Sequence, residues 1–110
     1  MSRAASRAKA GDVAGALADV EALTGESAAP GYCYMGASVC SLASAAAKEP
    51  AQQEACARQA LTLLRRAQAA GFFKDRKRVE LVKKIPDLDA LRPREDFRRF
   101  VAELEAAVKP

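Results

Sequence analysis

The fold of this chain is decided by residues 32–71, YCYMGASVCSLASAAAKEPAQQEACARQALTLLRRAQAAG, whose pattern predicts two antiparallel helices. The first helix is expected over about 32–48. The second follows Pro50 and ends at Gly71, a residue type that suits a left-handed helix end. Pro50 also separates the two helices, because the residue before a proline avoids the helical region. We therefore expect a long helical hairpin against which the rest of the chain packs.

The composition favours an all-α fold. Hydrophobic residues make up 50% of the chain, yet only 5% of its residues are aromatic and much of the apolar content is alanine. Alanine side chains let helix axes approach closely. Ala, Leu, Arg, Glu, Lys and Gln dominate the long segments and are strong helix formers. At 110 residues the chain is predicted to form one domain, 1–110.

The first predicted helix of the hairpin carries no charged residue before Lys48. A helix without a charged face is normally buried on most sides, so we expect this helix at the centre of the domain. Tyr34 is offset from its apolar stripes, and its hydroxyl is expected to face water. The two stripes are Tyr32, Met35, Gly36 and Val39, and Cys33, Ala37, Cys40 and Ser41.

The segments that follow the hairpin are predicted to be short and helical. Asp75 is expected to cap a helix that ends near Lys84, and 86–91 is expected to form a helical turn. Pro93 fits the first position of a last helix. Phenylalanines gather in this region, which suggests a second small core. The side chains expected to face inward are Phe72, Phe73, Val79, Val82, Leu88, Leu91, Phe97, Phe100, Val101 and Leu104.

Two spaced patterns in the hairpin resemble the tetratricopeptide repeat (TPR). They are Tyr32-x-x-Met35-Gly36-x-x-Val39 in the first helix and Ala60-x-x-x-Leu64-x-x-Ala67 in the second. The resemblance implies a close helix crossing at the small residues Gly36 and Ala60. The distance between these two residues is about a dozen residues longer than in a standard repeat, which predicts an extended hairpin tip near 48–54.

Further motifs resemble the TPR segment at the C-terminal end of planctomycete-type bacterial serine/threonine protein kinases and related TPR proteins. An upstream match begins at Gly11-Asp12. The downstream motifs are LLRRAQAAGF (63–72), PDLDALR (86–92) and DFRRFVAEL (96–104). No kinase motif is present, since there is no glycine-rich phosphate loop, no His-Arg-Asp and no Asp-Phe-Gly.

The resemblance implies an all-α, right-handed stack of TPR-like antiparallel helix hairpins. Residues 1–24 would form a partial, degenerate repeat that includes a short helical piece at 2–10. Residues 30–71 would form the main extended hairpin, and 72–110 a C-terminal capping helix pair.

The TPR register also identifies candidate partner-binding residues. In TPR proteins that grip a partner's terminal carboxylate, first-helix positions supply Lys and Asn to the concave face. Here those positions are Cys33, Ala37, Cys40 and Ser41, none of which can hold a carboxylate by charge. We expect this stripe to pack on another helix, contributed by 2–10, by a missing upstream repeat or by a second copy.

A basic cluster is the main charged feature of a chain with net charge +4. Three interpretations stay open: a solvated helix face, a docking surface for an acidic protein segment, and a nucleic-acid site. The last is the least favoured, because aromatic residues do not interleave with the cations. The cluster consists of Lys74, Arg76, Lys77, Arg78, Lys83 and Lys84.

The sequence does not predict an enzyme, a metal site or a cofactor. Histidine, the usual general base at neutral pH, is absent. The cysteines are odd in number, contain no Cys-x-x-Cys pair and are expected to be small buried thiols.

These observations predict a non-catalytic protein–protein interaction module of scaffold or adaptor type. Self-association is one option, and a nucleic-acid- or acidic-partner-binding domain is the alternative. The N-terminal residues show no secretory signal pattern, and we expect a bacterial, cytoplasmic protein that does not bind membranes.

Overall fold

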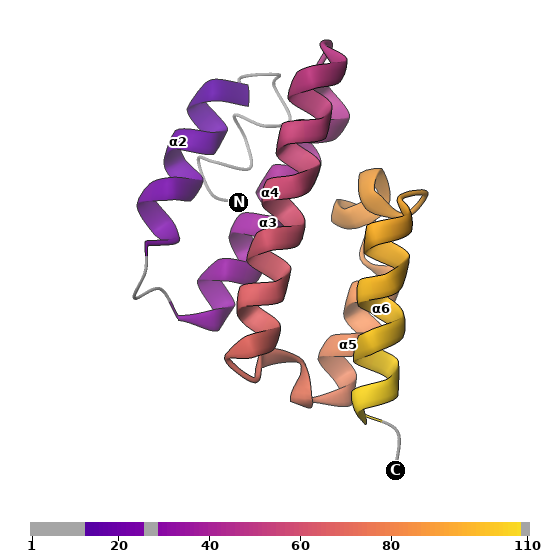
Figure 1. The fold of residues 1–110 in the computed structure, drawn as a ribbon. Coiled ribbons are helices and arrows are strands. Elements are labelled where there is room, and N and C mark those ends of the chain that lie inside the picture. The colour runs from indigo at the N-terminus through magenta and orange to yellow at the C-terminus, as the bar shows by residue number, and fades with distance from the viewer. Residues whose placement is uncertain (1–12, 26–28, 109–110) are drawn as a thin grey trace.

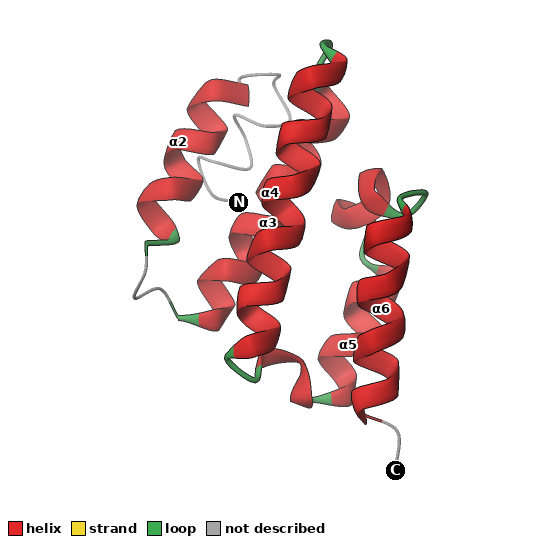
Figure 2. Cartoon of the chain, in the orientation of Figure 1, coloured by secondary structure: helices red, strands yellow, loops and turns green. Residues whose placement is uncertain are grey.

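The computed structural model describes residues 13–25 and 29–108, and these residues are helical or in short connections, with no strand among them (Figures 1 and 2). The predicted all-α class is confirmed. The elements are α2 (Val13–Leu23), α3 (Pro30–Ala46), α4 (Pro50–Ala69), η1 (Phe72–Lys74), α5 (Arg76–Lys84), η2 (Pro86–Leu91) and α6 (Glu95–Val108). The predicted helical piece at 2–10 and the Gly11-Asp12 motif lie outside the described residues.

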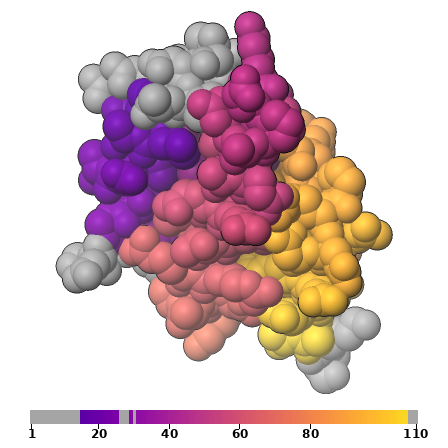
Figure 3. Space-filling view, turned by 45° about the horizontal axis from the view of Figure 1, so that its top comes forward, coloured from indigo at the N-terminus to yellow at the C-terminus, as the bar shows by residue number. Residues whose placement is uncertain are grey.

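The α3–α4 hairpin forms the middle of the molecule, with α2 on one side and the α5–α6 pair on the other (Figure 1). Figure 3 shows these layers in direct contact. Helix α3 ends at Ala46, and only residues 47–49 link it to α4, so the extra length of the hairpin lies in its helices. Gln53 closes the tip, where its Nε2 donates to Ala47 O at 2.8 Å and its own carbonyl accepts from Ser44 Oγ at 2.9 Å.

At Gly36 of α3, side chains from the α2 segment and from α4 pack close to the helix. A Cβ atom placed on Gly36 would lie 2.9 Å from Thr24 Cγ2, 3.2 Å from Val20 Cγ1 and 3.1 Å from Leu63 Cδ1. The sequence predicted that Gly36 meets Ala60 at a helix crossing, but the α4 residue nearest to this Cβ position is Leu63. The neighbours of Gly36 come from two helices, so three helices meet where the sequence predicted a crossing of two.

Arg66 of α4 joins α2 to the hairpin. Its Nη1 donates to Thr24 O at 2.9 Å and its Nη2 to Gly25 O at 2.8 Å, just beyond the last residue of α2. The last carbonyls of a helix have no partner within it, so this guanidinium supplies donors that the helix lacks. The contact fixes the C-terminal end of α2 against α4.

The C-terminal segment turns back on the hairpin after Gly71, whose φ of 88° lies in the left-handed region that glycine favours. Asp75 caps α5, because its side chain accepts from Lys77 N at 2.9 Å. The prediction that Pro93 begins the last helix is wrong. Helix α6 begins at Glu95, and Pro93 lies in a turn closed by Arg94 N, which donates to Leu91 O at 2.9 Å.

The phenylalanines do not form a separate small core. The Phe73 ring lies 5.7 Å from that of Phe100 in α6 and 6.0 Å from that of Tyr34 in α3, and Phe72 stacks on Tyr34 at 5.3 Å. Such ring pairs add favourable contacts to the area they bury. The aromatic group therefore joins the C-terminal helices to the hairpin in one continuous core.

None of the helices in the described part of the chain is both long enough and apolar enough to cross a bilayer.

The packing at Gly36 generates a stability prediction with a control in the same helix. Gly36→Val should lower the free energy of unfolding by about 1–3 kcal/mol, because the new side chain overlaps α2 and α4. Gly31→Val should cost less, since a Cβ there meets only one atom, Phe72 Cε1 at 4.0 Å. Urea denaturation followed by circular dichroism measures both. Equal midpoints for the two variants would contradict the close approach.

Candidate functional site

The predicted partner-binding residues Cys33, Ala37, Cys40 and Ser41 are core residues of this fold. Their side chains are 0–3% exposed. Helix α3 packs along α4 and also against η2, which the sequence predicted as a helical turn without indicating its position. The stripe is thus covered by elements of this chain, and it offers no surface to a partner in the folded state.

The cysteines behave as buried thiols, as predicted, and all of them are free. Burial, together with the neighbouring Cys56 of α4, raises the pKa of the Cys40 thiol to about 12. Because the thiolate is the reactive form, these groups contribute packing rather than nucleophilic chemistry. The described residues contain no group of three or more His, Cys, Asp or Glu side chains arranged to hold a metal ion.

The Tyr34 hydroxyl does not face water as expected. It is buried and has no hydrogen-bond partner among the described residues. Burial raises its pKa, the nearby Asp87 of η2 adds to this shift, and Arg92 opposes it. Tyr34 therefore belongs to the α3–η2 contact, where its ring also stacks on Phe72.

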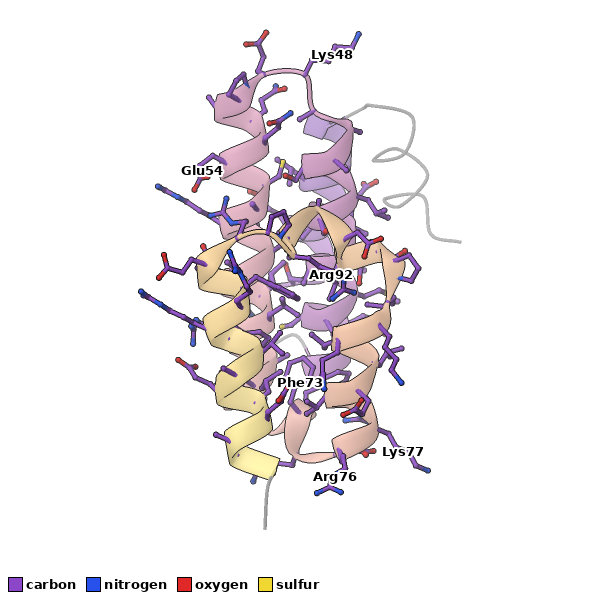
Figure 4. All side chains as sticks on the ribbon, turned by 90° about the vertical axis from the view of Figure 1, so that its right-hand side faces the viewer. Lys48, Glu54, Phe73, Arg76, Lys77 and Arg92 are labelled. Atoms are coloured by element: carbon purple, nitrogen blue, oxygen red, sulfur yellow. The ribbon has the colours of Figure 1, made fainter. Side chains whose placement is uncertain are left out.

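The basic cluster is divided by the fold. Lys83 pairs with Glu105 of α6 at 3.3 Å and with Glu80 at 3.5 Å, and these carboxylates raise its pKa. The Arg78 guanidinium lies 4.2 Å from the centre of the Phe72 ring and donates to Phe72 O at 3.1 Å. Arg76 and Lys77 lie at the N-terminal end of α5, at the other end of the helix from Lys83, and Figure 4 shows their side chains pointing away from the helices. All six residues of the cluster are exposed, namely Lys74, Arg76, Lys77, Arg78, Lys83 and Lys84.

A shallow pocket of about 250 Å³ opens between α5, η2 and α6, on the face of the molecule seen in Figure 4. Its apolar part comes from Phe97 and Val101, one turn apart on α6, of which Phe97 is buried and Val101 half-buried. Its cationic part comes from Lys83 of α5, Arg92 at the end of η2 and Arg98 of α6. The pocket thus combines apolar and cationic side chains from α5, α6 and the residue after η2.

Arg92 is held in place by the end of α5. Its Nη2 donates to Ile85 O at 2.7 Å and its Nη1 to Val82 O at 3.3 Å, while its Nε pairs with Asp89 at 2.7 Å. These carbonyls belong to the last turn of α5, where the helix itself supplies no donors. The guanidinium that lines the pocket is therefore fixed before anything binds.

A second ionic cluster joins α4 to the start of α6. Arg94 binds both carboxylate oxygens of Glu54, with Nη1–Oε1 at 2.7 Å and Nη2–Oε2 at 3.1 Å, and it also pairs with Asp96 at 2.9 Å. Arg58 reaches Glu54 at 2.7 Å. Arg94, and then Arg58, lower the pKa of the Glu54 carboxyl to about 2. The bidentate geometry sets the position of α6 along α4.

The pocket was not predicted from the sequence. Phe97 and Val101 were expected to face inward, and Lys83 was part of the basic cluster. The sequence pattern, however, did not indicate that Arg92, Arg98 and Lys83 would line one pocket together with these apolar residues. The sequence feature that could have indicated the pocket is the position of Arg92 and Arg98 close to the apolar stripe that begins at Phe97 in the last helix. The stripe alone does not show which face of α5 lies opposite.

The described residues form an all-helical fold with a pocket between α5 and α6. No known protein family, curated protein or solved structure matches the chain significantly. The function is therefore argued from the surfaces of the molecule.

Burial of the predicted stripe generates a second stability prediction. Ala37→Glu should destabilise the fold by about 3–5 kcal/mol, since it places an unpaired charge in the core. Ala45→Glu, on the exposed side of the same helix, is the matched control and should change stability little. Thermal denaturation followed by circular dichroism compares the two. An Ala37→Glu variant as stable as Ala45→Glu would show that the stripe is open.

The Glu54 cluster generates a pH prediction. The folded-state pKa of about 2 lies below the ordinary 4.5, so the stabilisation is present above pH 4.5 and is lost as the pH falls toward 2. Glu54→Gln should lower the Tm at pH 6, and the difference from the unmodified chain should vanish near pH 2.

Thermal denaturation between pH 2 and pH 6 measures this effect. Glu49→Gln, at the exposed hairpin tip, is the control, because the Glu49 side chain forms no ion pair with any described residue. Its Tm should follow that of the unmodified chain at every pH. A constant gap between Glu54→Gln and the unmodified chain would mean that Glu54 does not titrate as proposed.

Proposed function

We propose that the chain is a non-catalytic protein-interaction module of TPR-like architecture, which self-associates through one end of the α2–α3 pair. The spaced motifs in α3 and α4 support the TPR-like assignment, as does the close packing at Gly36. In this proposal α3 and α4 form the main hairpin of a right-handed stack, and α5 and α6 form its capping pair. The resemblance of its motifs to the C-terminal TPR segments of planctomycete-type bacterial kinases supports a scaffold or adaptor role.

The observation that carries the proposal is a group of exposed apolar side chains. Leu23, Tyr32 and Met35 are 38%, 49% and 45% exposed. Leu23 ends α2, and the other two lie in the first turns of α3, so all three belong to the same end of this helix pair (Figure 1). Large apolar side chains exposed at one end of a small domain are consistent with a contact site.

A second copy is the partner that fits this surface. Helix α3 contains no charged residue over Pro30–Ala46. In a two-fold dimer the same patch meets itself, so like charges at its centre would repel. Tyr32 and Met35 lie on the uncharged helix α3 and so bring no like charges to such a contact, and the three large side chains supply apolar area to bury.

The proposal predicts a dimer that a surface substitution separates. Met35→Glu should convert the dimer to a monomer in light scattering coupled to size-exclusion chromatography, because it places two carboxylates in the shared patch. Leu81→Glu is the matched control, since Leu81 is equally exposed at 48% but lies on α5. It should leave the dimer intact.

Circular dichroism must show that both variants remain folded. A chain that stays strictly monomeric at high micromolar concentration would contradict self-association. A dimer that survives Met35→Glu combined with Tyr32→Glu would contradict the assigned surface.

A further inference from the structure

We propose that the pocket between α5, η2 and α6 binds an acidic segment of a partner protein, in which one apolar side chain is flanked by carboxylates. This site goes beyond self-association, since it lies across the α3–α4 hairpin from α2 (Figure 1). The proposal stands on the shape of the pocket, the charges around it and the fixed position of Arg92.

The pocket has room for one side chain. Its volume of about 250 Å³ is below that of typical sites for drug-sized molecules. Its exposed apolar lining comes mainly from the half-buried Val101, because Phe97 is only 2% exposed. A leucine, isoleucine or phenylalanine side chain from an extended or helical segment matches these dimensions and this chemistry.

The charges around the pocket select an acidic partner. Arg98 uses one of its donors, with Nη2 donating to Pro93 O at 3.0 Å, and Arg92 uses three. A guanidinium carries five N–H donors, so both arginines keep donors for carboxylates. The pairing of Lys83 with Glu105 is partly exposed, at 36% and 39% of the two side chains. Exposed pairs contribute little, so a partner's carboxylate can replace Glu105 at small cost.

The position of Arg92 reduces the cost of binding. Contacts with Val82 O, Ile85 O and Asp89 hold its guanidinium before the partner arrives. A side chain that is already ordered loses little conformational entropy on binding. Planar bidentate recognition of a carboxylate by such a group is also more selective than attraction to a mobile lysine.

The pocket favours a protein segment over nucleic acid. Sequence-tolerant binding of single strands requires exposed aromatic faces on which bases stack. The aromatic residue here, Phe97, is only 2% exposed, so its ring offers contact to a small apolar group but no stacking platform. The three cations share the pocket lining with apolar side chains.

The experiment uses the complete chain and a phage-displayed library of random peptides as the probe. The enriched peptides are expected to share one large apolar residue with Asp or Glu on both sides. The most enriched peptide, synthesised with a fluorescent label, is then measured by fluorescence polarisation against two variants. Arg98→Glu should weaken binding by about tenfold or more, because it reverses a charge at the pocket. Lys77→Glu should change binding by less than about twofold, although it alters the net charge equally.

Three results would overturn the proposal. The first is a selection that enriches no peptides, or only peptides without flanking carboxylates. The second is a loss of binding that is equal in Arg98→Glu and Lys77→Glu, which would indicate general electrostatic attraction. The third is displacement of the peptide by single-stranded oligothymidylate at lower concentration than by unlabelled peptide, which would assign the pocket to nucleic acid. The monomer–dimer state is measured separately, so none of these results bears on self-association.

Discussion

The structure depends on the absence of a side chain at Gly36, where side chains of neighbouring elements pack against α3. Because this residue has no side chain, Val20 of α2, Thr24 just after α2 and Leu63 of α4 can all pack against α3 at this point. Much of the surrounding core is alanine, with Ala16, Ala37, Ala43, Ala57, Ala60 and Ala67 at 0–2% exposure. Small side chains bury little area each, so the core gains its dispersion energy from short distances between many atoms. Such packing tolerates little added volume at its centre.

Arginine side chains form hydrogen bonds at the ends of the helices. Arg66 binds carbonyls just beyond α2, Arg92 binds carbonyls at the end of α5, and Arg94 connects the start of α6 to Glu54 of α4. Each joins a helix terminus to a neighbouring element through a long stem that also covers apolar surface. The helices are therefore held together near their middles by close packing and near their ends by hydrogen bonds to guanidinium groups.

The sequence predicted the bounds of the helices better than it predicted which elements pack against one another. Helical periodicity and proline positions indicated α3 and α4 to within about two residues, and Asp75 indicated the start of α5. Periodicity shows which face of a helix is apolar, but not what covers that face. The stripe of Cys33, Ala37, Cys40 and Ser41 was therefore expected to pack on another helix without that helix being identified, and in the fold it is 0–3% exposed. The pocket was missed for the same reason, since it depends on how α5 and α6 face each other.

Arg92 both binds carbonyls at the end of α5 and lines the pocket, so local unfolding of that helix end also disrupts the pocket. When the last turn of α5 frays, its carbonyls leave Arg92, and the guanidinium that lines the pocket loses its orientation. Slow amide hydrogen exchange in this turn would therefore report an assembled pocket as well as an intact helix end. By reciprocal linkage, a ligand that binds Arg92 in its fixed orientation also stabilises the end of α5 against unfolding. Hydrogen exchange at this helix end therefore reports whether the pocket is occupied.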